Sequence, residues 1–337
     1  MPKTTMRVID IPQPGGPDAL VLNQRPLPPV EPEEVLIKVA AAGVNRPDTL
    51  QRQGNYPPPP GATDIPGLEV SGTVVELGRS VTDRDLGEKV CALLAGGGYA
   101  EYVAVDHRQV LPLPDGVDLV SAAAIPEAFF TVWANLFDRG QLTSGEIALI
   151  HGGASGIGTT AIQLARALGA RVFATAGTSA KIQLCETLGA ERAINYKRDD
   201  FAAVLKDTLG KRGVDVILDI AGASSFTQNM SVLATEGRLV IIGLLGGTKS
   251  QINLSRVMLK RLTVTGSTLR ARSPEEKGSI RDALREIVWP LLSSGVVKPI
   301  IQQTFGLEDV AQAHRLMDAN ATQGKLVLIV DHGQTEH

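Results

Sequence analysis

The chain has 337 residues, 20% of them charged and 43% hydrophobic, and this length allows two domains that each bury a core. Its net charge of −3 gives no indication of a nucleic-acid or anionic-membrane partner, and no apolar run approaches the length of a membrane span. Its two cysteines, Cys91 and Cys185, can form neither a disulfide framework nor a structural zinc site. We expect a globular, cytoplasmic protein.

The first 125 residues have the pattern of β structure interrupted by turns. Strand candidates bounded by Gly and Pro lie at 35–39, 70–77, 89–94 and 99–105. Between the last two, the glycines 96–98 predict a hairpin turn. The prolines 57–60 predict a stiff extended loop, either a spacer or the rim of a cleft, because proline cannot join a central strand.

From Pro126 onward the pattern changes to strands that alternate with helices. The apolar run 147–150 is typical of a buried parallel strand, and a glycine-rich turn and a helix that ends near Gly169 follow it. Further strands are predicted at 172–175, 193–195, 214–220, 238–242, 262–265 and 325–330, and helices at 179–188, 199–209 and 281–292, with another helix before 238. Strands that alternate with helices imply right-handed crossovers and a parallel sheet covered on both faces, which is a dinucleotide-binding fold.

The glycine turn after residue 150 is the strongest functional signal. A strand, a glycine turn and a helix in this order direct backbone N–H groups and the positive end of a helix dipole at one point, which suits a phosphate. The G-x-G-x-x-G fingerprint is matched in part, because Ser155 replaces its middle glycine. The turn also fits short-chain dehydrogenases, but none of Tyr56, Tyr99, Tyr102 and Tyr196 has the lysine four residues later that those enzymes use. His151 opens the turn, and we interpret it as structural.

The end of the second strand of this fold distinguishes NADH from NADPH. An NAD site usually has Asp or Glu there, which accepts a hydrogen bond from the ribose 2′-hydroxyl. No acid occurs within residues 171–185; Gly177 permits close approach, Thr178 and Ser179 offer hydroxyls, and Lys181 brings a cation. This group suits a 2′-phosphate, so we predict NADPH, with a merely solvated Lys181 as the alternative.

Blocks of residues along nearly the whole chain carry a resemblance to a known family. They are AGVNRPDTLQRQGNYPPPPG (42–61), IPGLEVSGTVVELG (65–78), AAAIPEAFFTVW (122–133), HGGASGIGTTAIQLA (151–165), TAGTSAK (175–181), INYKRDDF (194–201) and GKLVL (324–328). With them the chain resembles the medium-chain dehydrogenase/reductase superfamily, in its zinc-independent quinone oxidoreductase branch and most closely the p53-inducible type. The resemblance implies an α/β fold with a GroES-like, β-rich catalytic domain at 1–125, a Rossmann domain at 126–270 whose doubly wound parallel sheet binds NADPH, and a C-terminal segment at 271–337 that returns to the catalytic domain.

The same resemblance assigns roles to single residues. It places Asn45, Tyr56 and Thr131 at the nicotinamide and the substrate as catalytic residues. The implied cofactor site comprises Ser155, Gly156 and Ile157 at the pyrophosphate, Gly177, Lys181 and Tyr196 around the 2′-phosphate, Ile242, Gly243, Leu244, Ser267, Thr268 and Leu269 on the nicotinamide side, and Lys325 closing over the cofactor. The resemblance also implies a homodimer in which residues 262–269 pair with the same segment of a second copy.

Departures from the zinc alcohol dehydrogenases of this superfamily bear on the chemistry. Those enzymes hold a catalytic zinc with Cys, His and Cys or Glu at three places. Here the three places hold Asn45, Leu68 and Glu127, and one carboxylate cannot bind zinc, so we expect no metal. Without a Lewis acid, alcohol oxidation would be slow, whereas a quinone needs less help because its hydroquinone anion is delocalised over a ring.

We therefore predict an NADPH-dependent oxidoreductase that transfers hydride from nicotinamide C4 to a quinone in a cleft between the two domains. Tyr56 or Asn45 would donate hydrogen bonds, and the proton would come from solvent or from Tyr56. One alternative is a reductase of enoyl or alkenal double bonds, which the same branch includes. Another is a weakly active NADPH-binding sensor, stabiliser or RNA binder, although the acidic balance counts against RNA. The expected partners are a small-molecule acceptor and a second copy, with neither nucleic acid nor membrane.

Overall fold

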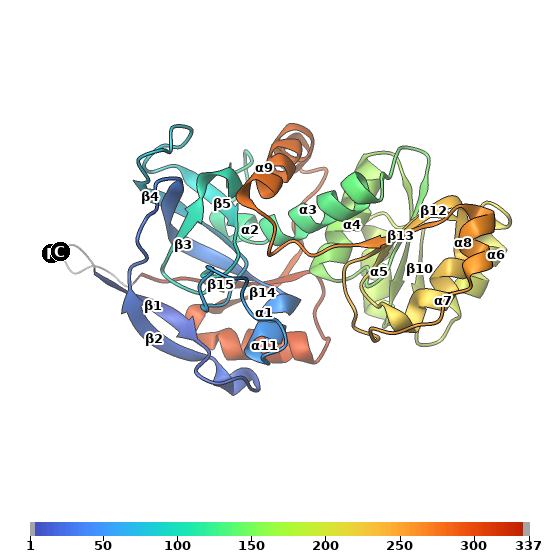
Figure 1. The fold of residues 1–337 in the computed structure, drawn as a ribbon, viewed down its shortest axis with the longest axis horizontal. Helices are drawn as coiled ribbons and strands as arrows, with labels where there is room; N and C mark the ends of the chain where they lie inside the picture. The colour runs from blue at the N-terminus through green and yellow to red at the C-terminus, as the bar shows by residue number, and fades with distance from the viewer. Residues whose placement is uncertain (1–3, 333–337) are drawn as a thin grey trace. The chain divides into compact units, whose positions relative to one another are not determined.

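The structure is a computed structural model that describes residues 4–332. The chain divides into two compact units. Unit 1 is formed by Met1–Phe130, Arg270–Gly295 and Pro299–His337, and unit 2 by Thr131–Leu269 and Val296–Lys298. Unit 1 thus combines segments from both halves of the sequence, and each unit has its own large sheet (Figure 1).

Unit 2 contains a six-stranded parallel sheet in the order β10-β9-β8-β11-β12-β13. Its strands are β8 (Ile147–Ile150), β9 (Arg171–Ala176), β10 (Arg192–Asn195), β11 (Val214–Asp219), β12 (Leu233–Ile241) and β13 (Thr263–Gly266). The order reverses at β8, from which the chain first builds one half of the sheet and then the other. This is the doubly wound Rossmann arrangement that the sequence predicts.

Helices cover both faces of this sheet. They are α4 (Gly156–Ala167), α5 (Ser179–Thr187), α6 (Phe201–Leu209), α7 (Ala223–Val232) and α8 (Leu254–Lys260), preceded by the π-helical η3 (Trp133–Arg139). Helix α3 (Pro126–Val132) comes before η3, and its residues up to Phe130 belong to unit 1. Figure 1 shows α6, α7 and α8 on one side of the strands and α4 and α5 on the other. Every residue of β8 is buried, because both faces of the strand are covered, and this explains its uninterrupted apolar run.

Unit 1 contains a mainly antiparallel seven-stranded sheet and a separate two-stranded one. The small sheet pairs β1 (Thr5–Asp10) with β2 (Val21–Pro26), and the large one comprises β3 (Glu34–Val44), β4 (Glu69–Leu77), β5 (Lys89–Leu93), β6 (Tyr102–Asp106), β7 (Val110–Pro112), β14 (Ile301–Gly306) and β15 (Lys325–Ile329). Strand β3 pairs with β6 along its first half and with β15 along its second half. The C-terminal strand predicted at 325–330 therefore enters the sheet of the first domain.

The helices of unit 1 lie between and after these strands. They are α1 (Arg46–Arg52), α2 (Leu119–Ala122), α9 (Pro274–Ala283), the π-helical η4 (Leu284–Val288), α10 (Trp289–Ser293), α11 (Val310–Asp318) and the 3-10 turns η1 (Pro17–Ala19), η2 (His107–Gln109) and η5 (Leu307–Asp309). The helix predicted to start at 281 begins at Pro274 instead, because Ser273 and Glu276 form a capping box around its first turn.

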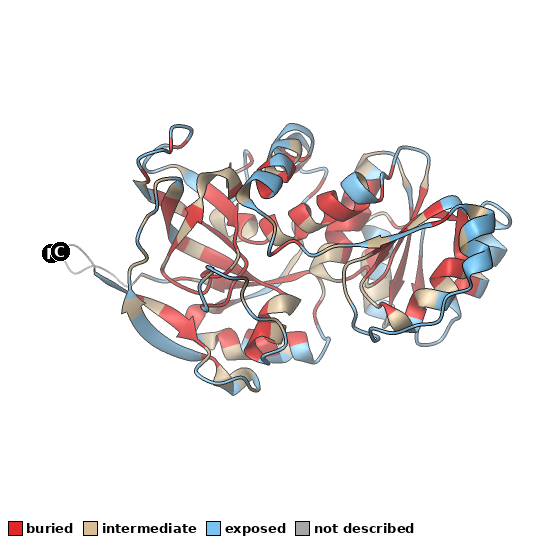
Figure 2. Ribbon diagram, viewed as in Figure 1, coloured by how far each residue is buried: buried red, intermediate tan, exposed pale blue. Residues whose placement is uncertain are grey.

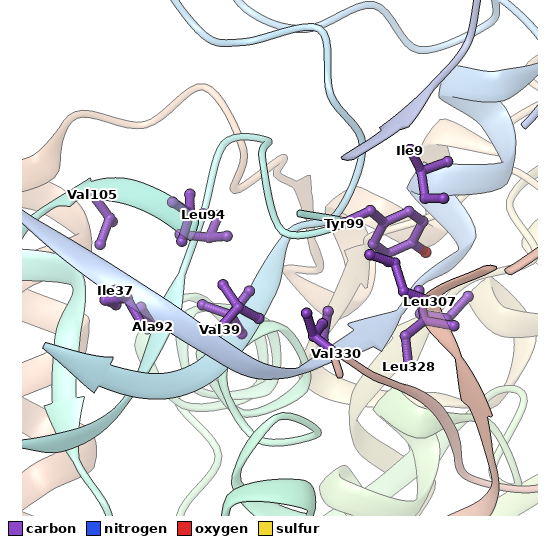
Figure 3. Close-up of a cluster of buried hydrophobic side chains, with 14 of the residues drawn as sticks. Ile9, Ile37, Val39, Ala92, Leu94, Tyr99, Val105, Leu307, Leu328 and Val330 are labelled. Carbon is purple, nitrogen blue, oxygen red and sulfur yellow. The ribbon is translucent and has the colours of Figure 1, made fainter. Parts of the chain in front are cut away.

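The core of unit 1 is an apolar cluster on its large sheet. Figure 3 shows part of it, including Ile37 and Val39 from β3 and Leu328 from β15. Val35, Ile37 and Val39 alternate along β3, so one face of this strand lies against the cluster. Buried residues concentrate on the central strands of both large sheets, such as β3 and β8, whereas β2 and β13 are mostly exposed (Figure 2). Within residues 4–332 no helix combines the length and the apolar character that a membrane span requires.

The predicted hairpin at glycines 96–98 is wrong, although its flanking strands form. β5 pairs with β4 and β7, whereas β6 pairs with β3, and the strand predicted at 99–105 begins only at Tyr102. The loop packs backbone against backbone: Gly98 N–H donates to the Gly67 carbonyl at 3.1 Å and Gly97 N–H to the Ile65 carbonyl at 2.8 Å. A Cβ on Gly98 would lie 3.0 Å from the Gly67 backbone. Glycine is therefore needed at this position for the close approach of the two backbones, and not for a hairpin turn.

Candidate active site

The turn after β8 has the geometry of a phosphate site. Ser155 caps α4, and its hydroxyl oxygen accepts a hydrogen bond from Gly158 N–H at 3.0 Å. Gly152 has a φ of +66°, in the left-handed region. A Cβ on Gly158 would lie 2.6 Å from Gly153 Cα and would overlap the Gly152 carbonyl oxygen. Because side chains have no room here, a ligand would meet the backbone at the start of α4.

The predicted cofactor residues of unit 2 gather at one edge of the parallel sheet. Each group follows a strand: Ser155, Gly156 and Ile157 after β8, Gly177 after β9, Tyr196 after β10, Ile242, Gly243 and Leu244 after β12, and Ser267, Thr268 and Leu269 after β13. Parallel strands end at the same edge, which is where open α/β sheets bind ligands. Two of the groups touch, since a Cβ on Gly177 would lie 2.7 Å from Tyr196 Oη.

Helix α5 begins directly after Gly177. Thr178 caps it, and its hydroxyl oxygen accepts a hydrogen bond from Lys181 N–H at 3.3 Å. Lys181 therefore lies in the first helical turn, and the nearby Tyr196 ring is exposed. The helix predicted at 179–188 is confirmed, whereas the binding of a 2′-phosphate by this ammonium stays a prediction.

A buried polar network that the sequence did not reveal joins the ends of three strands. His151 Nδ1 lies 2.9 Å from Thr175 Oγ1, and Nε2 lies 2.7 Å from Asn229 Oδ1. Asn229 Nδ2 donates to Asp219 at 3.2 Å, and Asp219 also accepts from Gly222 N–H. Burial lowers the pKa of His151, so its neutral ring donates from Nε2 to Asn229. The network holds the phosphate turn, in agreement with a structural role for His151.

Asn135, which the sequence reasoning missed, links two predicted residues. It lies in η3 and is buried. Asn135 Nδ2 donates to the Thr131 carbonyl at 2.9 Å, and its Oδ1 accepts from Ser267 Oγ at 2.7 Å. The structure thus joins Thr131 and Ser267 in unit 2. In the sequence, the only signal for Asn135 was a polar side chain within the mostly apolar stretch 129–137. The structure adds that Asn135 lies in a π-helical turn, and such turns are frequent at functional sites.

Unit 1 contains a cluster of buried charged groups around Glu69, the first residue of β4. Glu69 Oε1 accepts from Lys325 Nζ at 2.5 Å and from Asn45 Nδ2 at 2.9 Å, and Oε2 accepts from Glu127 N–H at 2.8 Å. Lys325 Nζ also donates to Asn45 Oδ1 at 2.5 Å. Both oxygens of Glu69 are therefore in use, and the charge of Lys325 is paired within unit 1. The predicted contact of Lys325 with the cofactor stays a prediction.

Asp48 connects this cluster to the core of unit 1. It forms the capping box of α1, and its Oδ2 accepts from Asn45 N–H at 2.8 Å and from Tyr99 Oη at 3.0 Å. Its Oδ1 accepts from Gly67 N–H at 3.2 Å. Burial raises the pKa of Asp48 to about 6, although these hydrogen bonds oppose the shift.

A second missed residue, His314 of α11, continues this chain of hydrogen bonds. His314 Nε2 lies 3.2 Å from Tyr99 Oη, and Nδ1 lies 3.2 Å from Arg52 Nη1. Because arginine only donates, Nδ1 must accept, and Nε2 carries the proton. Burial, followed by the charges of Arg52 and Arg46, lowers the pKa of His314 to about 3. His314 is therefore neutral and fixes the Tyr99 hydroxyl.

Tyr56 lies under the guanidinium of Arg270, also missed in the sequence. The Arg270 Cζ is 5.3 Å from the centre of the Tyr56 ring. Arg270 is buried and held by the Gln51 amide oxygen at 2.7 Å and the Ala95 carbonyl at 2.8 Å. Burial, with Glu127 as the next cause, raises the pKa of Tyr56, so its hydroxyl keeps its proton at neutral pH. Arg270 thus fixes the orientation of a predicted catalytic ring.

The three positions that hold zinc in related alcohol dehydrogenases do not fit a metal ion here. The Asn45 amide is bonded to Glu69 and Lys325, and Leu68 is a buried apolar side chain. In the described part of the chain, no group of three His, Cys, Asp or Glu side chains is arranged to bind a metal.

Comparisons with known proteins agree with this arrangement. Residues 31–115 match the family model of the alcohol dehydrogenase GroES-like domain, and residues 156–289 match that of the zinc-binding dehydrogenase. The quinone oxidoreductase of Lama guanicoe is 34% identical over 331 residues, which cover 96% of this chain and 98% of the relative. This chain belongs to the quinone oxidoreductase branch of the medium-chain dehydrogenase/reductase superfamily. It is accordingly an oxidoreductase of the medium-chain type.

Solved structures of medium-chain oxidoreductases share the whole fold. The Escherichia coli quinone oxidoreductase complexed with NADPH has a TM-score of 0.83 at 29% identity and covers 96% of this chain and 99% of its own. An NAD-dependent alcohol dehydrogenase has a TM-score of 0.85, also at 29% identity, and covers 97% of this chain and 100% of its own. Because one of these proteins is complexed with NADPH and the other is NAD-dependent, overall similarity does not distinguish NADPH from NADH for a medium-chain oxidoreductase.

Proposed function

We propose that this protein is an NADPH-dependent, zinc-independent quinone oxidoreductase. The observation that supports it most is the cluster of Asn45, Glu69 and Lys325. Asn45 stands at one of the three zinc positions, and its partners there are an ammonium and a carboxylate. A site of this kind suits an acceptor that is reduced without a Lewis acid. Metal analysis of the purified protein tests this part, and stoichiometric zinc would contradict it.

The residues at the carboxyl edge of unit 2 fit NADPH. The capped start of α4 would hold the pyrophosphate, and Gly177, Lys181 and Tyr196 would surround the 2′-phosphate. When bound, NADPH supplies the hydride. A charge-assisted hydrogen bond contributes about 1.5–3 kcal/mol, so Lys181→Ala should weaken NADPH binding roughly 10- to 150-fold and leave NADH binding nearly unchanged.

Calorimetric titration of both nucleotides measures this preference. Lys206→Ala, on the exposed side of α6, is the matched control and should change neither affinity. Equal losses of NADPH and NADH affinity in Lys181→Ala would remove the role assigned to Lys181.

The proposed substrate is a small-molecule acceptor, a quinone. Hydride addition gives a hydroquinone anion whose charge spreads over the ring, so hydrogen-bond donors can stabilise it. Among the described residues the Tyr56 hydroxyl has no hydrogen-bond partner, whereas the Asn45 amide is bonded to Glu69. Tyr56 would therefore meet the acceptor, and Asn45 would orient the charged cluster.

One assay separates the proposal from its alternatives. NADPH absorbance is followed with ortho- and para-quinones, alkenals and enoyl thioesters as acceptors. Turnover of quinones supports the proposal, and turnover of alkenals or thioesters alone would make the protein a double-bond reductase. Tight binding of NADPH without turnover would favour the sensor or stabiliser. The predicted cytoplasmic location belongs to the same proposal, and cell fractionation tests it.

We also propose a homodimer built on β13. This strand is the last in the order of the unit 2 sheet, and exposed apolar side chains lie on it and in the segment between β12 and β13. They are Leu244, Leu245, Ile252, Leu254, Met258, Leu259 and Val264, of which three on α8 are 69–72% exposed. Pairing of β13 with the same strand of a second copy would extend the sheet and cover them. Light scattering should give the mass of a dimer, and a monomeric mass would refute this pairing.

A further inference from the structure

Glu127 stands beside the buried cluster of unit 1 without belonging to its ion pair. It is the second residue of α3 and is half-buried. Its backbone N–H donates to Glu69 Oε2 at 2.8 Å, which places the two acidic residues side by side. Two adjacent carboxyl groups remain charged together only where each has its own counter-charge.

The nearby ammonium groups are committed to other partners. Lys325 Nζ is bonded to Glu69 and Asn45, and also lies 3.3 Å from the Val44 carbonyl. Lys277 is buried, and its Nζ donates to the Arg270 carbonyl at 3.0 Å. In residues 4–332 the carboxyl group of Glu127 has neither a hydrogen-bond nor an ion-pair partner. It therefore keeps its proton most easily of the acids in this cluster.

Charged and titratable groups in six parts of unit 1 interact electrostatically with Glu127. They are Glu69 on β4, Asp48 on α1, Tyr56 after α1, Arg270 before α9, Lys277 on α9 and Lys325 on β15. Burial is the main cause of its shift and Glu69 the next, and together they raise the pKa of Glu127 from 4.5 to about 8 against the two lysines. At neutral pH the carboxyl group of Glu127 is therefore protonated in most molecules.

A general acid works best when its pKa lies near the operating pH. Tyr56 fits less well, because burial raises the pKa of a phenol that is already a weak acid. The hydrogens of the Asn45 amide face Glu69 and, at 3.5 Å, the Gly43 carbonyl. Glu127 interacts electrostatically with Tyr56, whose hydroxyl has no partner in the described residues and can bind an acceptor.

We propose that Glu127 donates the proton that completes reduction of the quinone, while Tyr56 orients the acceptor. This inference rests on the proposed function and replaces solvent or Tyr56 as the proton source. When bound, NADPH would supply the hydride that converts the quinone into a hydroquinone anion. The carboxyl O–H bond of Glu127 then breaks as an O–H bond forms on the quinone oxygen. The products are hydroquinone, oxidised nicotinamide and the Glu127 carboxylate, which regains a proton from water.

Glu127→Gln tests the step, because it preserves shape and removes the acid. General acid catalysis contributes about 10²- to 10⁴-fold, so kcat with quinones should fall by at least about 100-fold at pH 7. Wild-type kcat should decrease as the pH rises through the Glu127 pKa of about 8, and this alkaline limb of the pH profile should be absent from the variant. Glu286→Gln, on the exposed side of η4, should leave kcat and its pH profile unchanged. Tyr56→Phe should raise KM and keep the alkaline limb.

Infrared spectroscopy gives a readout without turnover. In pH-difference spectra of the free wild-type protein, the carbonyl band of a protonated carboxylic acid should disappear with an apparent pKa near 8, and Glu127→Gln should lack that band. A Glu127 band that titrates at the ordinary pKa of a glutamate, or full activity of Glu127→Gln with an unchanged pH profile, would overturn the inference and leave quinone reduction intact. A wild-type protein that fails to reduce quinones would overturn the proposed function, and the assigned proton transfer with it.

Discussion

Replacing Glu69 by Gln should strongly destabilise unit 1. Glu69 is fully buried, and its two oxygens accept from Lys325, Asn45 and the Glu127 N–H. A glutamine has one acceptor oxygen, so its amide NH₂ would face one of these donors, and the Lys325 ammonium, with 5% of its side chain exposed, would lose its counter-charge. Removing one partner of a buried ion pair costs about 3–5 kcal/mol of the free energy of unfolding.

Urea unfolding, followed by circular dichroism and tryptophan fluorescence, measures the loss. Glu191→Gln is the matched control: its ion pair with Arg171 is 2.7 Å long, but the two side chains are 44% and 49% exposed. An exposed pair contributes about 0–1 kcal/mol. The double variant Glu69→Gln/Lys325→Met removes both charges and should lose less than the two single variants together, with a coupling of about 0.5–3 kcal/mol. A loss in Glu69→Gln no larger than that in Glu191→Gln would refute the reasoning.

Two further predictions concern the turn after β8 and the chain of hydrogen bonds at His314. Gly158→Ala should weaken NADPH binding by at least about tenfold, or about 1.4 kcal/mol, because a Cβ 2.6 Å from Gly153 Cα separates α4 from the turn. Calorimetry should show no change for Gly16→Ala, whose Cβ would meet nothing within 4 Å, and an unchanged affinity in Gly158→Ala would contradict the prediction. His314 has a folded pKa of about 3 against 6.5 when unfolded, so below pH 6.5 only the unfolded chain binds its proton, and the contribution of His314 to stability falls by about 1.4 kcal/mol per pH unit toward pH 3. Urea unfolding at several pH values should show this slope as the difference between wild type and His314→Gln, and parallel curves would rule it out.

Local patterns predicted the Rossmann unit well, because its strands are buried on both faces and give short apolar runs. The strands predicted at 172–175 and 214–220 are confirmed as β9 and β11, and the turn between β8 and α4 lies where the glycines indicated. The sheet of unit 1 was harder, because alternation reveals a strand but not its partner. β6 was recognised from Tyr102 onward, yet its pairing with β3, whose partner residues lie 64–72 positions earlier, was not.

Local sequence patterns also failed to predict which side chains meet around the candidate site. Lys325 meets Glu69 across 256 positions, His314 meets Tyr99 across 215, and Arg270 meets Gln51 across 219. No spacing rule connects residues so far apart, and only the fold brings them together. The start of α9 is different, because the capping box of Ser273 and Glu276 was readable and was missed.

The composition of unit 1 from separate segments has a consequence for synthesis on the ribosome. Strands β3 and β4, with Glu69, emerge long before β15 and Lys325, while unit 2 is almost entirely one continuous stretch between them. We expect the nascent chain to fold unit 2 first and to close unit 1 last, since contacts between distant segments form slowly. Until then β3 lacks its neighbour β15, and the acid at residue 69 lacks its counterion, so an interrupted chain would offer chaperones and proteases an unfinished sheet.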